Sequence, residues 1–235
     1  MKIIPIVIMV LICTAAAMAE EPVPDAETIV RKANHVALYQ GTALKGRVSI
    51  AIKDKQGRVR KRVLNILRLD SDTDRDGDQK YFAYFKSPAD VRKMVFMVHK
   101  HADPSQEDDR WLYMPALDLV KRIASGDKRT SFVGSDFLYE DISGRGIYED
   151  THTLFKTTDS HFILKNRPKN PKSVLFDYYL AHVNRYSFVA EKVEYYKKGD
   201  RLYRVMEVLE TEDVRAGEDG ASVSYPTVVK SQVRN

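Results

Sequence analysis

Cysteine is almost absent from this chain, which has one in its 235 residues, Cys13. That residue lies in an apolar leader that we expect to be removed, so the mature protein would contain no thiol. The absence excludes disulfides, thiol catalysis and cysteine ligands for metals. Stability must then come from packing, and the remaining length suffices for one sizeable core.

The leader has the pattern of a secretory signal. Lys2 precedes an apolar run, and Ala17-Met18-Ala19 fits the small-x-small cleavage site. We therefore expect a signal peptide over residues 1–19, a single domain over 20–235 and a periplasmic location. Two weaker alternatives stay open. One is that the leader is kept as a membrane anchor, although its apolar run is short for a membrane span. The other is that Cys13 carries a lipid, although the position before such a cysteine needs a small residue and here holds Ile12.

Charge is balanced. The formal net charge is +5 with 30% charged residues, and removal of Lys2 leaves +4. Basic and acidic residues are interspersed along the chain, which is typical of solvated strand faces, although a basic face could also meet anionic lipid headgroups. Export makes nucleic acid an unexpected partner.

The order of elements predicts an α+β fold. An amphipathic helix from Asp25 to Gln40, with Asp25 as cap and Gly41 beyond its end, places on one face Ile29, Ala33, Val36 and Ala37. Apolar alternation then predicts strands within 44–52, 59–69, 80–85, 91–98, 111–114, 151–158, 162–164, 186–196, 202–209 and 223–229. We expect Asn166 to Lys172 to be a loop, and no linker divides the chain. Such a succession favours a curved antiparallel sheet forming a half-open, incomplete barrel.

Recognisable catalytic motifs are lacking. Ser135 has no GxSxG elbow around it. The adjacent pairs Glu140-Asp141 and Glu149-Asp150 would point to opposite faces of a strand, which makes a cooperating acid and base awkward. We therefore expect a protein that is not an enzyme and that uses no cofactor.

Two groups of residues have weak metal-binding character. Asp72, Asp74 and Asp76 open an EF-hand-like loop, but its twelfth position is Ala83 instead of a bidentate glutamate. A solvated hairpin turn is the simpler interpretation. His99 and His101 would share one strand face and could bind a metal with Asp103, but no HExxH motif accompanies them.

The densest stretch runs from Arg110 to Asp141 and combines aromatic residues, basic pairs and two glycine breaks. We predict a strand that Pro115 ends, then a loop with a short helical turn that presents Phe132, Phe137, Leu138 and Tyr139. Methionines and aromatic rings suit either an ordinary core or an adaptable apolar cavity. The candidate cavity and lid residues are Met94, Phe96, Trp111, Tyr113, Phe132, Phe137, Leu138 and Tyr139. The candidate contacts to headgroups or a partner are Lys121, Arg122, Lys128 and Arg129.

Within this stretch, the run WLYMPAL followed by VKRIASGDKRTSFVGSDFLYEDI resembles the motif of bacterial outer-membrane lipoprotein-sorting proteins. These are relatives of the periplasmic carrier LolA and its outer-membrane acceptor LolB. The resemblance extends from near Asp25 to near Lys230. It implies a half-open barrel covered by helices, with an apolar cavity for lipid or lipoprotein acyl chains and transient contact with a membrane surface. The alternative is an accessory partner of an inner-membrane transporter that binds protein through the same aromatic surface.

Overall fold

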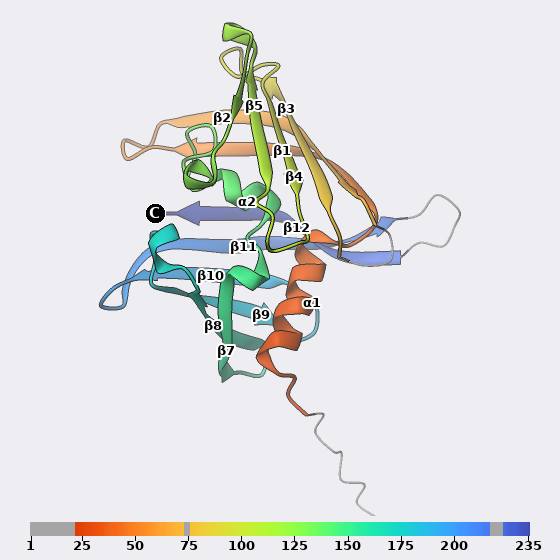
Figure 1. Cartoon of the computed structure of the whole chain (residues 1–235), viewed down its shortest axis with the longest axis vertical. Coiled ribbons are helices and arrows are strands. Elements are labelled where there is room, and N and C mark those ends of the chain that lie inside the picture. Colours follow the sequence, from red (N-terminus) through yellow and green to blue (C-terminus); the bar gives the residue numbers. More distant parts are fainter. Residues whose placement is uncertain (1–21, 73–75, 217–222) are drawn as a thin grey trace, which may run out of the picture.

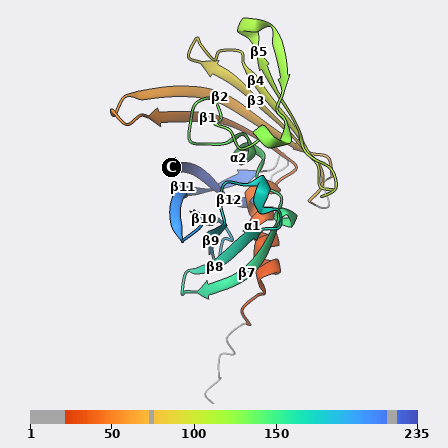
Figure 2. The same ribbon diagram turned by 60° about the vertical axis from the view of Figure 1, so that its left-hand side comes forward.

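Two antiparallel sheets of six strands each make up the described part of the chain. The computed structural model describes residues 22–72, 76–216 and 223–235. The first sheet contains, in spatial order, β1 (Ala43–Lys53), β2 (Val59–Asp70), β3 (Gln79–Ser87), β4 (Val95–Lys100), β5 (Asp109–Met114) and β6 (Leu119–Arg122). The second contains β7 (Asp150–Thr157), β8 (His161–Pro168), β9 (Tyr178–Asn184), β10 (Ala190–Lys197), β11 (Arg201–Ala216) and β12 (Val223–Arg234). Figures 1 and 2 show the first sheet arching above α2 (Tyr139–Ser143), with the second sheet below it.

The first sheet has one buried face and one solvent-facing face. Burial alternates residue by residue along β3, β4 and β5, as expected when successive side chains point to opposite sides of a pleated strand. Every neighbouring pair of strands in both sheets is antiparallel. The predicted curved antiparallel architecture, half-open and without closure, is confirmed.

The N-terminal helix α1 (Ala26–Leu38) covers the second sheet. The Asp25 side chain accepts a hydrogen bond from the Thr28 backbone N–H at 2.7 Å, which fixes where the helix begins. Ile29 and Val30 are buried against Phe162, Leu164 and neighbouring residues of β8 and β9. The helix is confirmed, but its predicted face was wrong in part: Val36 lies beside an open pocket and Ala37 is exposed.

The chain between β6 and β7, residues 123–149, is here called the strap. It contains η2 (Ser125–Asp127), the short helix α2 and η3 (Ile147–Glu149), and one isolated bridge joins Ser131 to Leu138. The predicted loop with a short helical turn is therefore confirmed. Its buried residues belong to the core of the first sheet.

Several strand boundaries differ from the prediction. β4 begins at Val95, because residues 88–93 form turns after β3. β8 continues to Pro168, and β9 was missed: its apolar residues were assigned to no strand, and the strand predicted over 186–196 begins only at Ala190. The remaining short helices are η1 (Pro115–Leu117) and η4 (Pro171–Ser173).

Some predicted features fall outside the described ranges. These are the leader over residues 1–19 with Cys13, and Asp74 of the acidic turn. Within the described ranges, no helix combines the length and apolarity needed to cross a membrane.

Candidate functional site

Four aromatic rings form the centre of the core beneath the first sheet. Phe85 of β3 and Phe96 of β4 meet Phe132 and Tyr139 of the strap, with ring centroids 5.1 to 5.7 Å apart. We call these four residues the aromatic cluster. The side chains of Phe85, Phe96 and Phe132 are fully buried, and Tyr139 is 8% exposed. Residues of the strap thus pack against the buried, apolar face of the first sheet. The space that they fill there is here called the hollow.

The backbone of the strap turns tightly beside Phe132. The Phe132 N–H donates to the Phe137 carbonyl at 2.7 Å, and the Ser135 hydroxyl donates to the Phe132 carbonyl at 2.7 Å. Val133, between them in the chain, has a φ of 48°. A β-branched residue adopts this left-handed conformation only when its surroundings impose it. The position of Phe132 is therefore held by the packing of the strap and not by local preference.

A network of buried ion pairs fixes the ends of the strap. It consists of Lys128, Arg129, Glu140, Arg145, Glu149 and Asp150. Glu140 lies 3.3 Å from the Lys128 ammonium and 3.1 Å from the Arg129 guanidinium. Arg145 contacts Glu149 at 2.7 Å and Asp150 at 2.9 Å. We call these six residues the charge network. It joins α2 to the start of β7.

Neighbouring cations lower the pKa of the Glu149 carboxylate in this network. Burial would raise the pKa of Glu149, but Arg145 and Lys128 outweigh it, so that the pKa lies below its ordinary value. Tyr179 of β9 donates a hydrogen bond to Asp150 at 2.9 Å. Burial, with the Asp150 charge, raises the pKa of Tyr179 well above its ordinary value. Glu149 is therefore ionised and Tyr179 is neutral near pH 7.

Lys100, at the end of β4, holds the C-terminal end of α2. Its ammonium donates to the carbonyls of Ser143 at 2.7 Å and Gly144 at 3.1 Å. Cations at this end of a helix satisfy carbonyls that have no partner within the helix. Burial lowers the pKa of Lys100 to about 8. A second tie runs from α2 to β11, where Arg204 contacts Asp141 at 2.5 Å.

The structure brings only part of the predicted cavity together. Phe96, Phe132 and Tyr139 meet in the aromatic cluster, and Met94 and Phe137 pack at its margin. Leu138 is half-buried beside them in the strap. Trp111 and Tyr113 are separated from these residues, because they alternate with the buried Arg110 and Leu112 along β5 and lie on the opposite face of the sheet.

The four predicted cations also divide into two pairs. Lys121 and Arg122 are exposed on β6. Lys128 is 8% exposed, and Lys128 and Arg129 both pair with Glu140 and Glu149. In this conformation the second pair is neutralised within the protein and unavailable to headgroups, so that part of the expectation requires correction. The sequence carried no signal for this pairing, since the acids lie well beyond helical or turn spacing.

The weak metal candidates have other contacts. Asp76 pairs with His35 at 2.8 Å, His101 pairs with Asp78 at 3.2 Å, and the His99 ring lies against that of Trp111. In the part of the chain that the structure describes, no three histidine, cysteine or carboxylate side chains are grouped to hold a metal ion.

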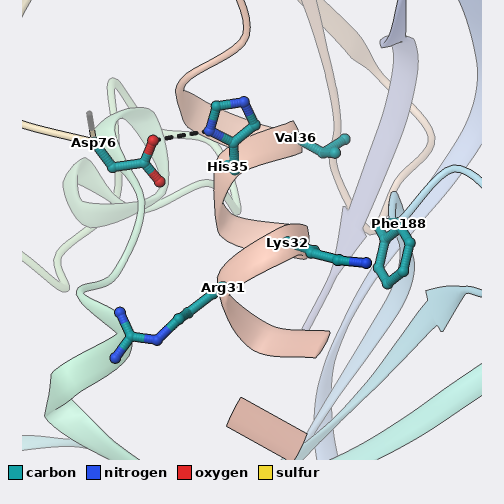
Figure 3. A pocket seen from close by; sticks show the side chains of 6 residues that line it. All are labelled: Arg31, Lys32, His35, Val36, Asp76 and Phe188. Carbon is teal, nitrogen blue, oxygen red and sulfur yellow. Dashed lines mark hydrogen bonds and ion pairs between the residues drawn. The ribbon is translucent and has the colours of Figure 1, made fainter. Parts of the chain in front are cut away.

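Two open pockets lie outside the aromatic cluster. One of about 480 Å³ is formed on α1 by Arg31, Lys32, His35 and Val36 with Asp76 and Phe188. Figure 3 shows Lys32 over the Phe188 ring and the His35–Asp76 pair at the opposite side. The other, of about 370 Å³, lies between η4 and the β10–β11 turn. Neither contains a residue of the predicted cavity.

Comparison with known proteins extends over most of the chain. The model of a family described as "uncharacterized protein" matches residues 77–235, more than half of the sequence. No curated protein matches it in sequence.

Solved structures share the fold. A structure described as an outer membrane lipoprotein-sorting protein domain, from Vibrio parahaemolyticus, is 24% identical, with a TM-score of 0.69 over 80% of this chain and 79% of that one. A DUF1329 family protein from Desulfovibrio piger is 26% identical, with a TM-score of 0.74 over 88% and 83%. A LolA superfamily protein from Nitrosomonas europaea is 16% identical, with a TM-score of 0.57 over 91% and 95%.

Proposed function

This chain belongs to the family whose model matches residues 77–235, and from the fold that it shares with an outer membrane lipoprotein-sorting protein domain and a LolA superfamily protein we propose a lipid-carrying function for it. The protein would be a periplasmic, non-catalytic carrier or docking module. Its cargo would be a lipid or the acyl chains of a lipoprotein, bound in the hollow of the first sheet. Transfer would be towards the outer membrane, and a transporter partner stays a prediction.

One observation carries this proposal. The hollow of the first sheet is filled by Phe132 and Tyr139, which come from a strap and not from the sheet itself. A long connection whose own side chains fill the hollow that it covers is typical of a lid. Outward movement of the strap would leave an apolar surface formed by β3, β4 and β5, of the kind that accepts acyl chains.

The apolar burial that the strap would lose in such an exchange can be offset by the acyl chains of the cargo. Exposing two aromatic side chains costs roughly 3 to 6 kcal/mol, and burying a methylene gains about 0.8 kcal/mol. Roughly four to eight methylenes therefore offset the loss of both rings. The cargo needs no charged contact in the hollow. Of the two exposed cations on β6, Lys121 is the partner of the buried Leu112 and lies on the same face as the hollow, where it would meet a headgroup.

Native mass spectrometry of the mature protein, purified from periplasm without detergent, tests the proposal. We expect a discrete co-purifying lipid mass that disappears on organic extraction. Replacing Phe132 and Phe137 by leucine, which keeps the strap apolar, should change the retained lipid fraction at least threefold, on the order of 0.7 kcal/mol.

The matched control is Leu67→Ala on the opposite face of the first sheet, where the side chain is 39% exposed. It should leave lipid retention unchanged. An empty wild-type protein, or equal retention in the folded leucine variant and the wild type, would argue against a carrier.

A further inference from the structure

The outer face of the first sheet carries a continuous row of large side chains. The row crosses all six strands in register and consists of Lys45, Leu67, Phe82, Met97, Trp111 and Arg122. Cross-strand partners in register lie on the same face of a sheet. An apolar row is thus bounded by a cation at each end.

A second row beside it has the same character. Tyr84, Val95, Tyr113 and Val120 are partners across β3 to β6, and the polar Asn65 and Arg47 continue the row on β2 and β1. Phe82 is 37% exposed and Val120 is 61% exposed. Such a broad apolar surface on a solvent-facing sheet is unusual without a partner. It lies away from α2 and the strap, which cover the other face (Figure 2).

Charge on this face is mainly positive, and its acidic exceptions are Asp109 and Asp118, the latter beside the Tyr113 hydroxyl. The six strands contain only two acidic residues, Asp70 on the core face and Asp109 on the outer face. Asp109 already pairs with Arg122 and His101. The outer-face cations are Lys45, Arg47, Lys53, Lys61, Lys80, Lys86 and Arg122. Of these, Arg122 is the only one that forms an ion pair among the described residues.

We propose that this face binds the surface of an anionic phospholipid bilayer. Half-exposed Trp and Tyr rings favour the headgroup region, aliphatic side chains enter the acyl boundary, and surrounding cations are attracted to anionic lipids. A second copy of the chain would bring like charges together, which disfavours it. The cations are spread along both sides of the apolar rows, which complements a continuous anionic plane better than a single acidic patch.

The proposed carrier would meet the membrane through this face, and that contact does not depend on the cargo. The two faces of the sheet can be tested separately. Vesicle binding requires the outer face, whereas lipid retention in solution requires the hollow under the strap.

Trp111 is the chain's only tryptophan and lies on the proposed surface, so its fluorescence reports binding directly. The mature protein is titrated with vesicles of phosphatidylcholine and with vesicles containing phosphatidylglycerol. We expect a blue shift and co-sedimentation with the anionic vesicles, both reduced by salt. Lys45→Glu with Arg47→Glu should weaken partitioning at least ~30-fold, which corresponds to about 1 kcal/mol for each cation.

A matched control reverses two exposed lysines in the connections of the second sheet, Lys172→Glu in η4 with Lys198→Glu in the β10–β11 turn, and should leave partitioning near that of the wild type. A further variant, Phe82→Ser with Leu67→Ser, should lose the blue shift while remaining folded by circular dichroism. The proposal is overturned by absent binding, by equal binding to neutral vesicles, or by unchanged binding in the Lys45 and Arg47 variant. Binding only to membrane proteins, or self-association through this face, would equally overturn it.

Discussion

Glu140 shows how single residues hold the strap. Its carboxylate accepts from Lys128, Arg129 and Arg145 and is almost fully buried. The pairing compensates for the loss of water around all four charges. Removing one charge leaves the others without that compensation, and this is far more costly than breaking a pair in water.

Glu140→Gln is therefore expected to lower the free energy of unfolding by about 3 kcal/mol. Glu149 and Asp150 remain near the three cations and limit the loss. Urea denaturation at neutral pH measures the change. Glu27→Gln is the control, since it breaks only the exposed Arg31–Glu27 pair of α1 and should have no measurable effect. Equal stability of the two variants would contradict a structural role for the network.

Lys100 predicts a pH dependence of stability. Its pKa is about 8 in the folded protein against an ordinary value of 10.5. Between these values the unfolded chain binds a proton that the folded chain does not, so stability rises as pH increases from about 8. Below about pH 8 both states are protonated and this contribution is constant.

The prediction is tested by urea denaturation of the wild type and Lys100→Met from about pH 7 to pH 9.5. The wild type should gain on the order of 1 kcal/mol per pH unit relative to the variant above pH 8. The range ends at about pH 9.5 because burial raises the pKa of Tyr39 and Tyr81. At higher pH these tyrosines lower the free energy of unfolding, which opposes the gain from Lys100. Parallel curves for the two proteins would show that Lys100 does not titrate as stated.

Sequence reasoning identified residue types correctly but not their neighbours. Phe96 and Phe132 were grouped because both are apolar, and they do meet. Trp111 was grouped with them for the same reason, although alternation with the buried Arg110 and Leu112 could have placed it on the other face. The pairing of Lys128 with Glu149 depends on how the strap folds back, which no local spacing encodes.

At the scale of elements, the strap passes close to the end of α1 at Gly144. Gly144 follows α2 with a φ of 75°, and a Cβ built on it would lie 2.8 Å from Leu38. The atom met is a side-chain methyl of Leu38, whose backbone carbonyl accepts from Arg68 and Gln79, so the Leu38 side chain and not the backbone of α1 would have to shift. Glycine is thus required here both for conformation and for space.

Gly144→Ala should consequently cost more than Gly199→Ala. Gly199, in the β10–β11 turn, has a similar φ of 72°, but a Cβ added there would meet no atom within 4 Å. Both substitutions incur the cost of the positive φ, and only the first also meets Leu38. We expect a difference of about 1 to 3 kcal/mol by thermal or urea denaturation. Equal costs would show that the contact between the strap and α1 is loose.

Elements with strong local signals were predictable. Asp25 caps α1 as its position suggested, and the turns near Gly57 and Gly199 separate the expected strands. β9 was missed because the strand is followed by the turn at residues 185–189, which was included in a longer predicted strand. The buried face of α1 was predicted correctly at Ile29 and Ala33 but wrongly at Val36 and Ala37, because periodicity in a short helix leaves its orientation to tertiary packing.

At the scale of the whole molecule, the two sheets are joined by contacts of the strap and of α1 and not by strand pairing between described strands. The core of the first sheet includes Phe132 and Tyr139, and the core of the second includes Ile29 and Val30. This division was not visible in the sequence, which predicted one curved sheet. It raises the question of whether both halves unfold together.

The charge network and the Arg204–Asp141 pair link the strap to the second sheet, and Lys100 and the aromatic cluster link it to the first, so we expect one cooperative transition. Leu164→Ala, in the second core, removes a side chain that is 1% exposed and should cost about 2 to 5 kcal/mol. Trp111 lies in the first sheet, and its fluorescence midpoint in urea should shift as far as the circular dichroism midpoint. Leu175→Ala, at a position 66% exposed, should shift neither. If only the dichroism moves, the sheets unfold independently, and a strap that opens would then release one half of the protein without disturbing the other.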